Sequence, residues 1–147
     1  MGRYLESFLK TRQAVRPFIS KANGAVLVGV SGGTDSMVLA AAALAESAGN
    51  RVIPVVVDHG LQSNSAEITE LVVKRLEKLG FTETFTARAA VELIDGIEAS
   101  ARRARYKIFE QAIETYGATI FLLRHNKNDQ AESVLLGLAR GSGTRSL

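Results

Sequence analysis

Short apolar runs alternate along the chain with longer stretches in which apolar residues recur at helical spacing. Three of the runs, residues 25–30, 51–57 and 118–123, are nearly continuous and rich in branched side chains. Such runs are typical of strands that are buried on both faces of a parallel sheet. A fourth run, residues 82–86, is weaker, so it is predicted to lie near an edge of that sheet.

Helices are predicted in the stretches that separate and flank these strands. Gly49 and Gly80 each follow such a stretch, and glycine commonly stands just after the last turn of a helix. Asn64 followed by Glu67 resembles a capping box, in which two side chains satisfy free N–H groups of the first turn. The expected helices span about residues 3–19, 36–48, 64–79, 98–116 and 128–139.

The alternation of strands and helices predicts the fold class. It indicates an α/β fold with a Rossmann-like parallel sheet and helices on both faces, because right-handed crossover connections place helices on both sides. No repeat or linker divides the chain, so residues 1–147 are expected to form one domain. In such folds ligands bind beyond the carboxyl ends of the strands, and the segments that follow a strand are therefore the candidate sites.

The composition excludes several classes of protein. The 147 residues contain no cysteine, so they cannot supply a disulfide, a thiolate metal site or a cysteine nucleophile. Two histidines argue against a multi-histidine metal site. No apolar run approaches the ~18–20 residues of a membrane-spanning helix, and the first residues lack the apolar stretch of a secretory signal. A cytoplasmic protein without membrane partners is expected.

The formal net charge of +3 arises in the last third of the chain. Residues 1–97 carry 10 basic and 10 acidic side chains, whereas residues 98–147 carry 8 and 5. A basic patch is the expected footprint of a polyanionic partner, although a solvated helix face is the commoner reason for one. The basic residues of this part are Arg102, Arg103, Arg105, Lys107, Arg124, Lys127, Arg140 and Arg145.

The segment directly after the first predicted strand is a candidate phosphate loop. Gly32 and Gly33 can adopt backbone angles that are closed to other residues, and the helix that follows offers free N–H groups to an anion. The hydroxyls of Ser31, Thr34 and Ser36 add donors. The segment has no lysine, so it is not the G-x-x-x-x-G-K-[ST] loop. A glycine-rich connector with a serine cap is the alternative interpretation.

The six residues Ser31-Gly32-Gly33-Thr34-Asp35-Ser36 resemble the Ser-Gly-Gly-x-Asp-Ser signature of the N-type ATP pyrophosphatases, or PP-loop enzymes. These enzymes cleave ATP between its α- and β-phosphates, adenylate a carbonyl-like oxygen and release pyrophosphate. Three further segments are similar to the tRNA(Ile)-lysidine synthetases of that family: residues 57–62, 98–106 and 125–133, the last followed by Arg-Gly-Ser-Gly at 140–143. Gln62, Asn126 and Asn128 depart from the family pattern, in which Arg, His and Asp are usual.

The resemblance implies a reaction and a set of site residues. The wobble cytidine of tRNA(Ile) would be adenylated, and the ε-amino group of free L-lysine would then attack it to give lysidine. Residues Ser31 to Ser36 would hold the pyrophosphate end of ATP, and magnesium is the expected companion of ATP. The catalytic residues implied are Asp35 as a magnesium-linked or orienting group, Arg105 as a stabiliser of charge on the α-phosphate, and Asp129 as a metal ligand or an orienting group for the amine.

Each assignment has a structural alternative. Arg105 could be an exposed helix arginine, and Asp129 could cap the last helix. Asp58 and His59 could line a nucleotide pocket or form a turn, and His125 could contact tRNA or be structural.

Family members continue beyond the Arg-Gly-Ser-Gly segment, so the chain resembles the front part of such an enzyme. We expect these 147 residues to bind ATP, to bind tRNA without discrimination and to form no lysidine alone. The alternative functions are another PP-loop amidating or thiolating enzyme and a non-catalytic nucleotide- or RNA-binding fragment.

Overall fold

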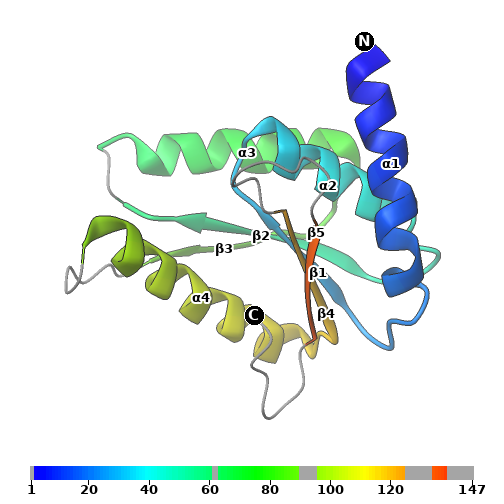
Figure 1. Ribbon diagram of the computed structural model, residues 1–147. Coiled ribbons are helices and arrows are strands. Elements are labelled where there is room, and N and C mark those ends of the chain that lie inside the picture. Colours follow the sequence, from blue (N-terminus) through cyan, green and yellow to red (C-terminus); the bar gives the residue numbers. More distant parts are fainter. Residues whose placement is uncertain (1, 61–62, 90–95, 125–133, 139–147) are drawn as a thin grey trace.

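Helices and strands alternate through the computed structural model, which describes residues 2–60, 63–89, 96–124 and 134–138 (Figure 1). In these parts of the chain no helix is long and apolar enough to cross a membrane. The elements in order are α1 (Gly2–Ile19), β1 (Val26–Val30), α2 (Thr34–Ala45), β2 (Val52–Asp58), α3 (Ser65–Leu79), β3 (Phe85–Arg88), α4 (Ile97–Tyr116), β4 (Ile120–Arg124) and β5 (Val134–Leu138).

The strands form one sheet in the order β3-β2-β1-β4-β5. The first four run parallel, and Val26 of β1 pairs with Val52 of β2 on one side and Ile120 of β4 on the other. The predicted parallel α/β sheet is therefore confirmed. The weak run at residues 82–86 does supply the edge strand beside β2, although the strand itself begins at Phe85.

The segment at β5 was expected to be helical, and that prediction is wrong for residues 134–138. They form a strand that pairs antiparallel with β4, so that Phe121 lies opposite Gly137. A short apolar run such as Val-Leu-Leu-Gly-Leu does not distinguish a helix from a strand by its period. The open edge of β4 offers unpaired backbone groups, and pairing with this edge satisfies them. The other residues of the expected helix lie outside the described residues.

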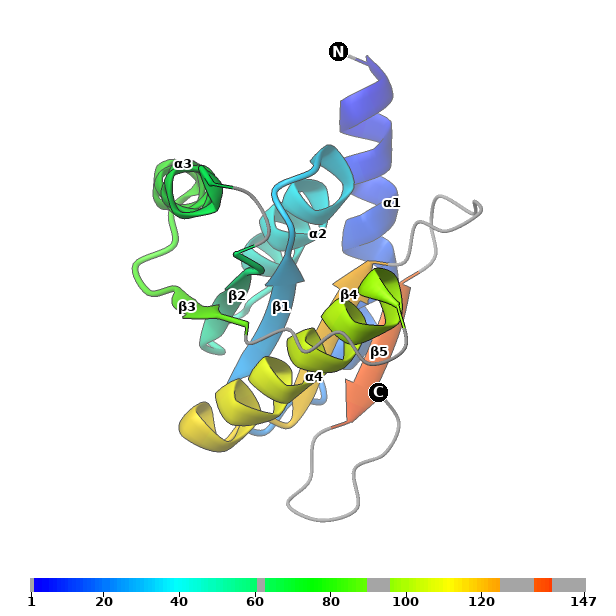
Figure 2. The same cartoon turned by 90° about the vertical axis from the view of Figure 1, so that its left-hand side faces the viewer.

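Both faces of the sheet are covered by helices, as Figure 2 shows. Alternate residues of β1 separate into two cores: Val26, Val28 and Val30 pack on the side of α1, α2 and α3, whereas Leu27 packs on the side of α4. A strand that is buried on both sides has no solvent-facing position, which explains its continuous apolar run.

The helix ends differ in part from the expectation. Gly80 and Gly117 have positive φ values of 119° and 62° and end α3 and α4 in the left-handed conformation. The capping box predicted for Asn64 and Glu67 is not formed, because the Asn64 side chain makes no capping hydrogen bond. Its backbone, at φ −105° and ψ 21°, lies outside the extended region from which a capping side chain reaches the first turn.

An ion-pair cluster joins the first two helices. The Glu46 carboxylate, just after α2, accepts hydrogen bonds from Arg12 Nε at 2.6 Å and from Arg16 Nε at 2.9 Å. Both arginines lie on α1, one turn apart, so a single carboxylate fixes α1 against the end of α2.

Candidate functional site

The loop from Ser31 to Gly33 connects the carboxyl end of β1 to the first turn of α2. Gly32 has φ +100°, and a Cβ atom there would meet the Val72 Cγ2 atom at 2.8 Å, so this position requires glycine. Gly33 has φ −75°, and a Cβ atom on it would lie 3.7 Å from the Ser31 Oγ atom, an ordinary van der Waals contact. The expectation that both glycines use angles closed to other residues is confirmed for Gly32 and wrong for Gly33.

The buried Ser36 hydroxyl holds this loop together. Its Oγ atom accepts hydrogen bonds from the Ser31 N–H at 3.1 Å and the Gly32 N–H at 3.2 Å, and it donates to the Gly33 carbonyl oxygen at 3.1 Å. The Ser31 hydroxyl lies 3.2 Å from the same atom. In this arrangement Ser36 fixes the loop from inside, and the outer surface of the loop is formed by Ser31, Gly33 and Thr34, which are exposed.

The first turn of α2 presents backbone donors. Gly33 is the residue before the helix and makes no side-chain capping bond, and the earliest helical bond from this turn is donated by Met37 to the Gly33 carbonyl. The N–H groups of Thr34, Asp35 and Ser36 therefore have no partner within the helix. Together with the positive end of the helix dipole, they can bind an anion.

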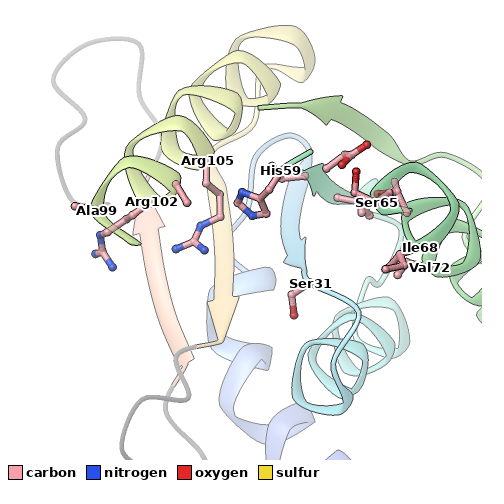
Figure 3. Close-up of a pocket in the computed structure, with 13 residues that line it drawn as sticks. Ser31, His59, Ser65, Ile68, Val72, Ala99, Arg102 and Arg105 are labelled. Carbon is pink, nitrogen blue, oxygen red and sulfur yellow. The ribbon is translucent and has the colours of Figure 1, made fainter. Parts of the chain in front are cut away.

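Two adjoining cavities open at the carboxyl ends of β1 and β2, with volumes of about 640 and 430 Å³. The larger has an aliphatic wall that includes Ile68 and Val72 of α3, and the smaller has an aromatic wall with Tyr106 and Phe109 of α4. Five residues line both cavities: Ser31, Val57, His59, Arg102 and Arg105. Figure 3 shows the larger cavity between α4 and α3, with Ser31 at the end of β1.

A tight turn after β2 places His59 at the boundary of the two cavities. The Asp58 carboxylate accepts a hydrogen bond from the Gly60 N–H at 2.9 Å, and Gly60 has φ +67°. The pKa of Asp58 is lowered, most strongly by the nearby Ser65 hydroxyl, although the two groups do not reach full hydrogen-bond geometry. The His59 Nδ1 atom is buried and has no hydrogen-bond partner among the described residues. Burial and then the charge of Arg105 lower the pKa of His59, which favours the neutral imidazole.

Arg105 is half-buried on α4 and is directed into the cavity beside His59 (Figure 3). Burial is the main cause that lowers the pKa of its guanidinium, and the neighbouring positive charge of Arg102 acts in the same direction. An anion bound in the cavity would offset both effects by its attraction to the guanidinium. The geometry is therefore that of a cationic group held ready for a phosphate or another developing negative charge.

The structure brings together only part of the predicted site. Ser31, Ser36, Arg105, Asp58 and His59 line the cavities, whereas the outer loop residues Gly32, Gly33, Thr34 and Asp35 stand beside them in the same turn. Asp129, His125, Asn126 and Asn128 lie outside the described residues. The sequence placed Tyr106 at the end of the similar segment 98–106 but assigned it no role. The signal that could have found it is its spacing of four residues from Arg102, which places the two on one helix face.

Metal binding is not shown by the described part of the chain. No three His, Asp or Glu side chains in it are grouped closely enough to hold an ion. Magnesium therefore stays a prediction.

Residues 5–147 match the PP-loop domain family. The chain belongs to this family. The match includes the loop after β1 and the whole of α4, so the motif that the sequence suggested is placed in the fold at the position where the cavities open.

Curated relatives of this PP-loop domain include tRNA(Ile)-lysidine synthases. That of Leifsonia xyli subsp. xyli is 46% identical over 134 residues, which are 90% of this chain and 40% of the relative. That of Streptomyces coelicolor is 51% identical over 124 residues, which are 83% of this chain and 35% of the relative. The chain thus spans about two fifths of the length of the curated relatives that it matches.

The PP-loop domain is also similar to a solved structure, the U34-tRNA thiolase NcsA from Methanococcus maripaludis. The TM-score is 0.63 at 21% identity, over 80% of this chain and 46% of that one. At this identity the similarity shows the shared fold alone.

Proposed function

We propose that this PP-loop domain binds ATP in the cleft between α3 and α4 and uses it to join lysine to the wobble cytidine of tRNA(Ile). The observation that carries the proposal is the position of Arg105, which faces the same cavities as Ser31 of the glycine loop. The similarity to tRNA(Ile)-lysidine synthases at 46–51% identity supplies the reaction and its substrates.

The residues present fit a nucleoside triphosphate. Gly33 has no side chain to cover the exposed surface of the loop, and the N–H groups of the first turn of α2 can donate to phosphate oxygens. Arg105 contributes a guanidinium, which pairs with phosphate through several N–H groups. The aliphatic wall of the larger cavity, with Val57, Ile68 and Val72, suits a flat base with little charge.

ATP would supply the activation, because transfer of its adenylyl group to the base oxygen turns that oxygen into a good leaving group. Arg105 would stabilise charge that develops on the α-phosphate, in a half-buried position where such a contact is strengthened by the lower dielectric constant. Asp35, in the first turn of α2, would hold magnesium or orient the phosphate end of ATP. For Asp129 the proposed role is to bind metal or to orient the lysine amine.

Nucleotide binding can be tested with two glycine variants that the structure separates. The Cβ atom of Gly33→Val would make only an ordinary contact, at 3.7 Å from the Ser31 Oγ atom, so we expect a wild-type melting temperature and the loss of ATP binding. Gly32→Ala is the contrasting variant: its Cβ atom collides with Val72 and its backbone is strained, so both stability and ATP binding should fall. Unchanged ATP affinity in Gly33→Val, measured by calorimetry, would contradict the assignment of the loop.

The reaction itself can be tested by mass analysis of tRNA(Ile) after incubation with full-length protein, ATP and lysine. A mass increase that corresponds to one lysine, dependent on both small substrates, is expected. Replacing Asp35 with Ala should reduce this product by ~10²-fold, the scale of one lost electrostatic contact in a transition state. Modification by a different group, or none with the intact protein, would overturn the proposed substrate.

A further inference from the structure

Two arginines of the cleft have no acidic partner in the part of the chain that the structure describes. Arg102 and Arg105 line both cavities, and no ion pair or hydrogen bond joins either of them to another residue within the described parts of the chain. Asp58 is the one carboxylate among the described residues that line the cavities, and it accepts a hydrogen bond from the Gly60 N–H. The cleft therefore holds two guanidinium groups whose charge is not neutralised there.

Both guanidinium groups lie against one aromatic ring. The Cζ atom of Arg102 is 5.1 Å from the centroid of the Tyr106 ring, and the Cζ atom of Arg105 is 5.8 Å from it. These distances are within the range of a cation–π interaction. Tyr106 also lines the smaller cavity, so the ring and both cations meet at the site rather than on a remote surface.

The ring is itself fixed by the core. Tyr106 packs against Phe109 with ring centroids 5.2 Å apart, and Phe109 packs in turn against Phe121 of β4 at 4.6 Å. Phe109 and Phe121 are buried, and they belong to the core on the α4 side of the sheet. A continuous stack of aromatic side chains thus connects the sheet to the two arginines.

An aromatic ring orients a cation without neutralising it, whereas a carboxylate would do both. A carboxylate beside Arg102 and Arg105 would have to be displaced before a phosphate could bind, and each displacement would cost binding free energy. The quadrupole of a ring leaves the N–H groups of the guanidinium free to donate. It also opposes the repulsion between the two like charges, which are three residues apart on one helix.

We propose that Tyr106 is a positioning residue that holds Arg102 and Arg105 as an open pair for a phosphate-bearing ligand of the cleft. The proposal rests on the function proposed above and deepens it. It assigns Arg102 to ligand binding and Tyr106 to the positioning of both guanidinium groups. The shared ligand chemistry is phosphate, which either ATP or the backbone of the RNA substrate can supply.

Three variants of the 147-residue chain test this role, with ATP and a short single-stranded RNA as separate probes. Tyr106→Leu removes the ring, and we expect the affinity for one probe or both to fall ~10-fold, the combined scale of two cation–π contacts. Tyr106→Phe keeps the ring and should restore the affinity. Tyr116→Leu is the matched control, because Tyr116 lies on the same helix and holds Arg51 at 5.3 Å, away from the cleft. It should bind both probes as the unaltered chain does.

The outcomes separate this proposal from the one on which it rests. Loss confined to ATP assigns the pair to the nucleotide, and loss confined to RNA assigns it to the RNA backbone. Affinity that is equal in Tyr106→Leu and the unaltered chain would overturn the positioning role alone. Tyr106→Phe that binds as weakly as Tyr106→Leu would also overturn it, because the ring would then not be the cause. No binding of ATP by the unaltered, folded chain would overturn the proposed function as well.

Discussion

The molecule contains two pairs of arginines on helices, and the two pairs have opposite surroundings. On α1, Arg12 and Arg16 both bind the carboxylate of Glu46, whose side chain is only 11% exposed. On α4, Arg102 and Arg105 both lie against the Tyr106 ring and line the cavities. The first pair joins two helices and shares one carboxylate, whereas the second lines the cavities and has no carboxylate partner among the described residues.

The difference shows how a basic residue can be assigned to structure or to function. A neutralised arginine has already formed its favourable contacts, so the molecule gains little by offering it to a ligand. The charged form of Arg105 is disfavoured by burial and by the like charge of Arg102, and a bound anion would stabilise it. Helical spacing of charge does not separate the two cases, because both pairs occupy neighbouring turns of a helix.

The largest expected effect is the loss of activity on removal of Arg105. Arg105→Ala should lower ATP-dependent pyrophosphate release by the full-length protein, with tRNA(Ile) and lysine present, by ~10²-fold. Its melting temperature should change little, since the guanidinium makes no ion pair within the described chain.

Arg16→Ala is the control for that experiment and should show the reverse pattern. It should lower the melting temperature and leave pyrophosphate release per folded molecule unchanged, because Arg16 binds Glu46 far from the cleft. A large fall in melting temperature for Arg105→Ala, with normal activity per folded molecule, would show that both pairs are structural.

A smaller effect is expected from the carboxylate of the α1–α2 cluster. Hydrogen bonds from Arg16 and Arg12 lower the pKa of Glu46 to about 2 from 4.5. The unfolded chain therefore takes up this proton first, so the stabilisation is present above about pH 4.5 and is lost as the pH falls toward 2. Glu46→Gln should lower the melting temperature by a few degrees at neutral pH, as for a modest ion pair.

Thermal melts at several pH values check this expectation. The difference between the unaltered chain and Glu46→Gln should shrink as the pH falls from about 4.5 toward 2, and ATP affinity at neutral pH should be equal in the two. A difference that is constant over this range would mean that Glu46 stabilises the contact between α1 and α2 by packing and not by its charge.

Most of the fold could be predicted from the sequence because three of the four parallel strands have a continuous apolar pattern that few other structures share. A continuous run such as residues 25–30 fits a strand between two helical layers, and the structure divides Val26 and Leu27 between two cores as that pattern requires. The segment of β5 could not be predicted, because its five residues fit either period and its state depends on the open edge of β4. Asn64 could not be assigned a capping bond because that bond depends on its backbone angles.

The site was predicted as a set of motifs and not as a geometry. The sequence located the loop at Ser31–Ser36 and the helix with Arg105, and the structure places both at the carboxyl ends of the strands. The sequence alone could not show that Ser36 directs its hydroxyl into the loop, or that Gly33 has an ordinary backbone conformation. Helical spacing of charge could not show which arginine has a carboxylate partner, since pairing of Arg12 with Glu46 at the end of another helix is a tertiary contact.

The smallest expected effect is a change in the salt dependence of RNA binding. Nonspecific binding rests on neutralised phosphates, so the logarithm of the binding constant falls linearly with the logarithm of the salt concentration, by about 0.7 per contacted phosphate of a single strand. Arg102 is exposed at the mouth of the cleft and unpaired within the described residues, so Arg102→Ala should make the slope shallower by about that amount. Arg51 is also exposed, but it donates to both carboxylate oxygens of Glu83, and Arg51→Ala should leave the slope nearly unchanged. Titration of a short single-stranded RNA at several salt concentrations measures both slopes. Equal slopes for the two variants would mean that pairing with an acid does not decide which arginines meet the RNA.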